Sequence, residues 1–64
     1  MSHAEIWMHG VKSITLVRRF KSNSNSRCIR IETEDGQSLD IQLYGNTGKL
    51  EMLPKHKEFR DADA

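Results

Sequence analysis

Apolar and polar residues alternate through the middle of the chain. Residues 27–33 and residues 38–44 each carry an aliphatic or β-branched side chain at every second position. On one face these side chains are Ile29, Ile31 and Thr33 in the first segment and Leu39, Ile41 and Leu43 in the second. A two-residue period is typical of strands that bury one face. Residues 13–20 are also rich in such side chains and predict a third strand, with one parity that holds Ile14, Leu16 and Phe20.

The connections between these segments agree with hairpins. Residues 22–26 read Ser-Asn-Ser-Asn-Ser and are typical of a mobile polar loop. Between the other two segments, a two-residue Asp35-Gly36 turn would set Ile31 opposite a carboxylate. A three-residue loop over residues 34–36, with Gly36 at positive φ, instead pairs Ile31 with Leu39. Burial of the aliphatic face favours the three-residue loop.

The flanking segments have weaker strand patterns. Residues 5–8 precede Gly10 and predict a strand beside residues 13–20, and residues 49–53 predict a strand that ends at Pro54. Residues 55–64 are charged and predict a tail that frays or forms a short helix. The expected fold is mainly all-β: an antiparallel meander of four or five strands in one domain over residues 1–54, either an open curved sheet or a small barrel.

The chain can bury only a small core. It has 64 residues, of which 36% are hydrophobic and 6% aromatic. Domains of this size are stabilised by disulfides, metals or self-association. Cys28 is the only cysteine, so no disulfide can form within one chain. We therefore expect a homodimer, paired sheet on sheet or edge to edge.

The charges are divided between the two halves of the chain. Residues 6–31 contain six basic residues and no acidic one, whereas eight of the nine acidic residues follow residue 31. One interpretation is a basic surface for an anionic partner. The other is that the two halves neutralise each other across neighbouring strands. The sequence favours neither.

No arrangement typical of an enzyme or of a cofactor site is present. Cys28 lies in mid-strand without a nearby histidine, and the three histidines show no metal-ligand spacing. The acidic residues near the turn have no obvious pocket for acid–base chemistry. We expect no catalysis, cofactor or metal. A single cysteine, no apolar run long enough to span a bilayer and no signal-like start predict a cytoplasmic protein.

The hairpin next to the polar loop predicts a binding surface. Its register would place Arg19, Lys21 and Arg30 on the face opposite the aliphatic side chains, with Tyr44. Arginine and lysine beside hydroxyl groups suit phosphate contacts, but a pI near 7.9 is low for a nucleic-acid-binding domain. Exposed sheet edges also suit a protein partner. Trp7 is interpreted either as an anchor for that partner or, preferably, as part of the core.

The leading hypothesis is a non-enzymatic accessory protein. A chain this short would suit the compact genome of a phage or plasmid. The protein would regulate or inhibit a larger protein through a basic hairpin and an exposed sheet edge. Binding of nucleic acid through the same hairpin is the alternative. The candidate partner-binding residues are Arg18, Arg19, Lys21, Arg27, Arg30, Tyr44 and Trp7.

Overall fold

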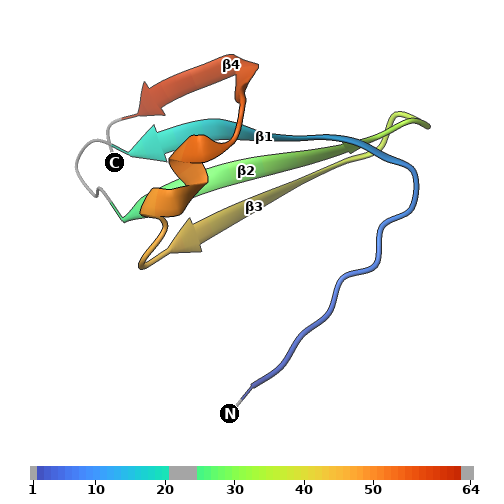
Figure 1. The fold of residues 1–64 in the computed structure, drawn as a ribbon, viewed down its shortest axis with the longest axis horizontal. Coiled ribbons are helices and arrows are strands. Elements are labelled where there is room, and N and C mark those ends of the chain that lie inside the picture. The colour runs from blue at the N-terminus through green and yellow to red at the C-terminus, as the bar shows by residue number, and fades with distance from the viewer. Residues whose placement is uncertain (1, 21–24, 63–64) are drawn as a thin grey trace.

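The computed structural model describes residues 2–20 and 25–62, which form one open four-stranded sheet in the order β3-β2-β1-β4 (Figure 1). The elements are β1 (Val11–Phe20), β2 (Ser26–Thr33), β3 (Ser38–Tyr44), the short 3-10 helix η1 (Gly48–Met52) and β4 (Lys55–Ala62). The predicted all-β class is confirmed, with an open sheet rather than a barrel.

The predicted hairpin between β2 and β3 is confirmed in its register. Ile31 lies opposite Leu39 and Ile29 opposite Ile41, so the aliphatic side chains share one face. The loop begins after Thr33, whose N–H donates to the carbonyl of Gln37 at 2.9 Å. Gly36 has φ +88°, a conformation that side chains with a Cβ rarely adopt. Local turn chemistry and burial of one face therefore specify the same pairing.

A β-bulge interrupts β1 at Val17. Leu16 pairs with Ile29, but the next partner of β2, Cys28, pairs with Arg18. The extra residue moves each later side chain of β1 to the other face. Arg19 therefore lies opposite Arg27, on the aliphatic side of the sheet. The prediction that Arg19 lies on the polar face is wrong for this reason.

The prediction of a frayed or helical C-terminal tail is wrong for residues 55–62. These residues form β4, which pairs with β1 in parallel, with Arg18 opposite Arg60 and Arg19 opposite Asp61. A parallel neighbour cannot be reached by a hairpin, so residues 45–54 cross one face of the sheet to reach it. The sheet is therefore mixed, and only its first three strands form the predicted antiparallel meander.

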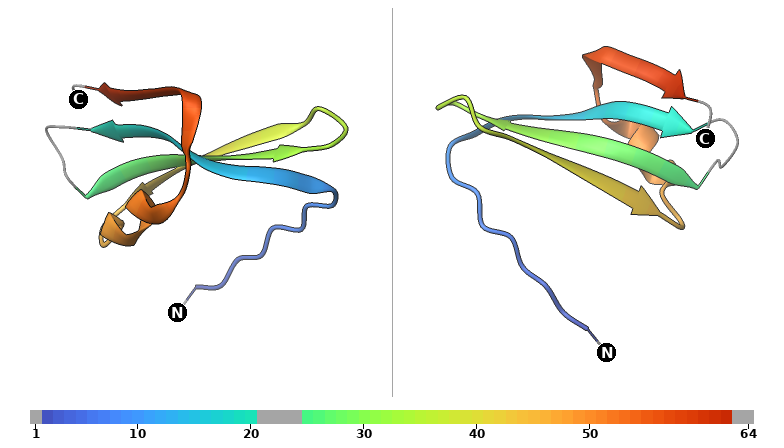
Figure 2. Two further views of the ribbon diagram at one scale, coloured as in Figure 1. Left: turned by 45° about the horizontal axis from the view of Figure 1, so that its top comes forward. Right: turned by 180° about the vertical axis from the view of Figure 1, so that it is seen from behind.

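Two further predicted strands are also wrong. The segment over residues 49–53 lies mostly in η1, where Leu50 N–H donates to the carbonyl of Thr47 at 3.0 Å. Residues 5–8 belong to no strand and lie in an extended arm, residues 2–9, which leaves the sheet in both views of Figure 2. Most of the predicted polar loop, with Lys21, lies outside the described residues. No helix in residues 2–20 and 25–62 is long and apolar enough to cross a membrane.

The core is as small as the composition predicts. Among the described residues, the buried hydrophobic side chains are Leu16, Val17 and Cys28. The molecule measures 36 × 34 × 19 Å and has a radius of gyration of 12.5 Å. A compact domain of this length would have a radius of gyration of about 11 Å, and the extended arm contributes to the larger value. The aliphatic side of the sheet is covered only in part, by η1.

Leu16 should contribute most to the stability of this core. Leu16→Ala should lower the free energy of unfolding by about 2–5 kcal/mol, because the side chain is fully buried and leaves a cavity. Met52→Ala is the matched control: its side chain is 84% exposed, and the change should stay within about 0.5 kcal/mol. Urea denaturation monitored by circular dichroism measures both. Equal effects of the two substitutions would show that Leu16 is not the centre of the core.

Candidate interaction surface

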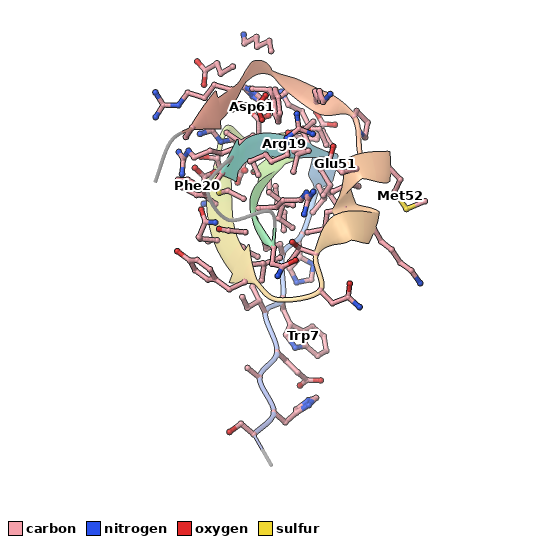
Figure 3. The ribbon with its side chains drawn as sticks, turned by 90° about the vertical axis from the view of Figure 1, so that its left-hand side faces the viewer. Trp7, Arg19, Phe20, Glu51, Met52 and Asp61 are labelled. Carbon is pink, nitrogen blue, oxygen red and sulfur yellow. The ribbon has the colours of Figure 1, made fainter. Side chains whose placement is uncertain are left out.

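The carboxylate of Glu51 in η1 joins the strands beneath it. Arg27 of β2 donates from Nε to Glu51 Oε2 at 2.6 Å, and Arg19 of β1 donates from Nη1 to Oε1 at 2.8 Å. Arg19 also donates from Nε to Asp61 Oδ1 of β4 at 2.7 Å. Figure 3 shows Arg19 between Glu51 and Asp61. We call these four residues the Glu51 network; it connects β1, β2, β4 and η1.

Burial and pairing set the electrostatics of the Glu51 network. Arg27 is only 8% exposed, and its Nη1 also donates to the hydroxyl of Thr47 at 3.1 Å. Hydrogen bonds from Arg27 and then from Arg19 hold the pKa of Glu51 below its ordinary value. Hydrogen bonds to Asp61 and Glu51 raise the pKa of Arg19. Both shifts favour the charged forms of Glu51 and Arg19 at neutral pH.

A second set of charges occupies the opposite face. Arg30 of β2 donates from Nε and Nη2 to the carboxylate of Asp40 in β3, at 2.7 and 3.0 Å, and from Nη1 to Glu58 in β4 at 3.0 Å. The hydrogen bond from Arg30 lowers the pKa of Asp40. His56 of β4 lies 3.3 Å from Glu32 of β2. The carboxylates of Asp40 and Glu58, on either side of β2, thus neutralise Arg30.

The candidate basic residues have different surroundings. Arg19, Arg27 and Arg30 are each paired with described carboxylates, and Arg27 is buried. Lys21 is not among the described residues. Arg18 is half-buried opposite Arg60, and its Nε has no hydrogen-bond partner within the described part of the chain. The structure therefore brings together paired arginines rather than an open basic hairpin.

The arm presents the largest apolar side chains to solvent. Trp7 is 78% exposed and Ile6 is 68% exposed, and Figure 3 shows Trp7 on the arm, away from the sheet. The preferred interpretation of Trp7 as a core residue is wrong. Residues 2–9 contain no lysine or arginine and one glutamate. The arm is thus an extended segment with little charge, in which Ala4, Ile6, Trp7 and Met8 are apolar.

The edge of the sheet at β3 is regular and open. The N–H of Gly45 donates to the carbonyl of Asn25 at 2.9 Å, as that of Thr33 does to Gln37 at the other end of the hairpin. Backbone groups of antiparallel strands alternate in direction, so residues 39, 41 and 43 face β2. Outward-facing backbone groups then belong to Ser38, Asp40, Gln42 and Tyr44. Tyr44, a candidate partner-binding residue, has an exposed side chain at the end of this edge.

The two edges of the sheet differ in how well they are protected from pairing with another strand. Residues 38–44 contain no proline or lysine, and their pairing with β2 shows no register shift. The strand at the other edge, β4, follows Pro54, is densely charged, and pairs irregularly with β1. Proline, lysine and irregular pairing are the features that usually block edge-to-edge association. Of the two edges, β3 is the one open to another strand.

The described residues offer little for catalysis. Within residues 2–20 and 25–62, no group of three or more His, Cys, Asp or Glu side chains could hold a metal ion. Burial raises the pKa of the Cys28 thiol, which disfavours the nucleophilic thiolate.

The important residues that were absent from the sequence-based candidates are acidic or lie in β4. They are Glu51, Asp61, Glu58 and Phe59; the ring of Phe59 lies 5.4 Å from the guanidinium carbon of Arg19. Each of these carboxylates pairs with an arginine of the first half of the chain. The separation of basic and acidic residues along the sequence could have indicated them, because one interpretation of it is that the two halves of the chain neutralise each other.

Comparisons with known proteins add no relative: no protein-family model, curated protein or solved structure matches this chain.

The Glu51 network should make the free energy of unfolding depend on pH in the acidic range. Because the folded state lowers the pKa of Glu51, its contribution is complete above the ordinary value of 4.5 and is lost as pH falls through the lowered value. Glu51→Gln should lower the free energy of unfolding at pH 7 by roughly 1.5–3 kcal/mol, because the buried Arg27 loses its charge-assisted hydrogen bond to Glu51. Stability of this variant should also fall less between neutral pH and acid pH than that of the wild type.

Glu58→Gln serves as the control, since Glu58 is an exposed acceptor on the other face. Urea denaturation at several pH values between neutral and acid compares the three proteins. A Glu51→Gln variant as stable at neutral pH as Glu58→Gln would contradict a structural role for the network.

Proposed function

We propose that this chain is a non-enzymatic protein that binds a larger protein through its N-terminal arm, with Trp7 as the anchor. The observation that carries the proposal is the 78% exposure of Trp7 in a molecule with so small a core. An aromatic side chain removes roughly 150–250 Å² from water when buried. Burial of Trp7 in a partner would supply the interaction that this chain does not use for its own fold.

The chemistry of the arm favours a protein as the partner. Extended segments bind proteins by adding a strand to a sheet or by placing alternate side chains in pockets. Trp is enriched among the residues that dominate such interfaces. Phosphate contacts need cations, and residues 2–9 contain none from lysine or arginine. A partner with an apolar groove fits this arm better than nucleic acid does.

Three of the arginines predicted to bind a partner already form ion pairs within the fold, whereas Trp7 of the arm does not. Arg19, Arg27 and Arg30 would have to leave described carboxylates before contacting a partner. Trp7 has no such competing role, because the sheet does not cover it. Regulation or inhibition of the bound protein remains the biological role that we propose for this contact.

Trp7→Ala should remove partner binding without unfolding the protein. Tagged wild type, Trp7→Ala and Met52→Ala are used for affinity capture from a nuclease-treated lysate of the organism that encodes the chain. Met52→Ala is matched because it also removes an exposed apolar side chain, but from η1. A partner retained by the wild type and by Met52→Ala should be lost with Trp7→Ala, with affinity lower by roughly thirtyfold or more.

Purified partner then allows a direct measurement. Trp7 is the only tryptophan, so its fluorescence emission reports on the arm alone and should shift to shorter wavelength on binding. The proposal fails if every partner captured by the wild type binds Trp7→Ala equally well and leaves the emission of Trp7 unchanged.

Nucleic-acid binding is the second candidate, and the pair of Arg18 and Arg60 is the observation that favours it. The two residues are partners in the register of β1 and β4, and like charges on neighbouring strands repel unless an anion lies near them. A gel-shift titration tests this with wild type, an Arg18→Ala, Arg60→Ala double variant, and Lys49→Ala as control. A shift that weakens steeply with salt and disappears only in the double variant would favour this candidate. No shift at low salt would exclude it.

A further inference from the structure

The pattern of apolar and polar residues in β3 is nearly the same in both chain directions. Residues 39–43 read Leu-Asp-Ile-Gln-Leu, an aliphatic side chain alternating with a polar one on either side of Ile41. The strand forms an open edge with regular pairing on its inner side only. We infer that two copies of this chain associate edge to edge through β3, antiparallel about a two-fold axis at Ile41.

The side chains select this register over its neighbours. With the axis at Ile41, Leu39 meets Leu43 of the second copy, Ile41 meets its own equivalent, and Asp40 meets Gln42. An axis at Asp40 would place two carboxylates directly opposite each other, which is unfavourable. An axis at Gln42 would pair only residues 40–44 and set Asp40 opposite Tyr44. A shift by one residue would place aliphatic side chains opposite polar ones.

The backbone directions fit the same register. The outward N–H and C=O groups of β3 belong to Ser38, Asp40, Gln42 and Tyr44. An axis at Ile41 sets Asp40 opposite Gln42 and Ser38 opposite Tyr44, so these outward groups meet one another and can exchange hydrogen bonds. Ile41 and its equivalent then form a non-hydrogen-bonded pair, in which Cα atoms lie about 4.5 Å apart. Neither strand would need a bulge or a shift.

A second copy is also the occupant that the small core favours. Pairing at β3 would continue the sheet across the axis and join the aliphatic sides of both copies into one strip. Domains with too little core are often stabilised by symmetric association, and an isologous interface needs a self-complementary patch. The arm runs on the β3 side of the sheet (Figure 1). Its residues are exposed except for Met8, which is half-buried, so little packing within the described chain holds the arm beside β3.

Cysteine cross-linking tests the axis itself. Ile41→Cys should form a disulfide-linked dimer on mild oxidation, because the two Cβ atoms lie opposite each other within bonding range. Leu39→Cys and Leu43→Cys should not cross-link alone but should form a mixed dimer when combined. Wild type is the control for Cys28, which is buried in β2. Cross-linking of Leu39→Cys or Leu43→Cys alone, with none for Ile41→Cys, would overturn the register.

Matched charges at residue 42 provide a test that needs no oxidation. Gln42→Lys and Gln42→Glu both lose the hydrogen bond from Gln42 to Ser26 Oγ, so their effects on the fold should be similar. In the inferred register, residue 42 faces Asp40 of the second copy. Gln42→Lys should lower the Kd of the dimer and Gln42→Glu should raise it, each by roughly three- to tenfold. Sedimentation velocity over a concentration series measures both values.

A wild type that stays monomeric at all concentrations tested would overturn the inference, as would a dimer that responds equally to both charges at residue 42. The inference goes beyond the proposed binding function and uses different residues. Trp7→Ala should leave the dimer intact, so a failure of the dimer and a failure of arm binding are distinguishable.

Discussion

A carboxylate held between two arginines is the interaction on which this fold depends. Glu51 accepts hydrogen bonds from Arg19 and from the buried Arg27, and Arg19 also binds Asp61. A buried guanidinium is strongly unfavourable unless its charge is paired. Glu51 can pair with the buried Arg27 because η1 lies over β2, and that position brings the following strand to the edge of β1. In a sheet with few buried apolar side chains, charge pairing positions the last third of the chain.

The hairpin of β2 and β3 was predictable because its information is local. Alternation fixes which side chains face the same way, and only one loop length keeps Ile31 and Leu39 together while Gly36 supplies the positive φ. Both requirements act within a few residues of the turn, so a reading of neighbouring positions is sufficient. The same alternation failed in β1, because a bulge at Val17 reverses the faces and leaves no mark in the sequence pattern.

The last strand and the arm could not be predicted from local patterns. β4 has almost no apolar alternation; its acidic residues Glu58 and Asp61 pair with arginines 28 and 42 residues earlier in the chain. Such pairing depends on which strands become neighbours, and the separation of charges along the chain indicates only that it is possible. For Trp7, a preference for burying the largest side chain gave the wrong place, because Trp7 lies on the arm, where its side chain is 78% exposed.

The thin sheet, the open edge and the exposed tryptophan have one physical cause. A chain with so few apolar residues can cover its aliphatic side only in part, and two of the places left open are the β3 edge and the arm. Strand pairing at β3 uses backbone groups and a self-complementary register, so it suits an identical copy. The arm has an irregular sequence with no internal symmetry, so it suits a different molecule. Because the two surfaces share no residue, self-association can stabilise the sheet while the arm stays free to bind.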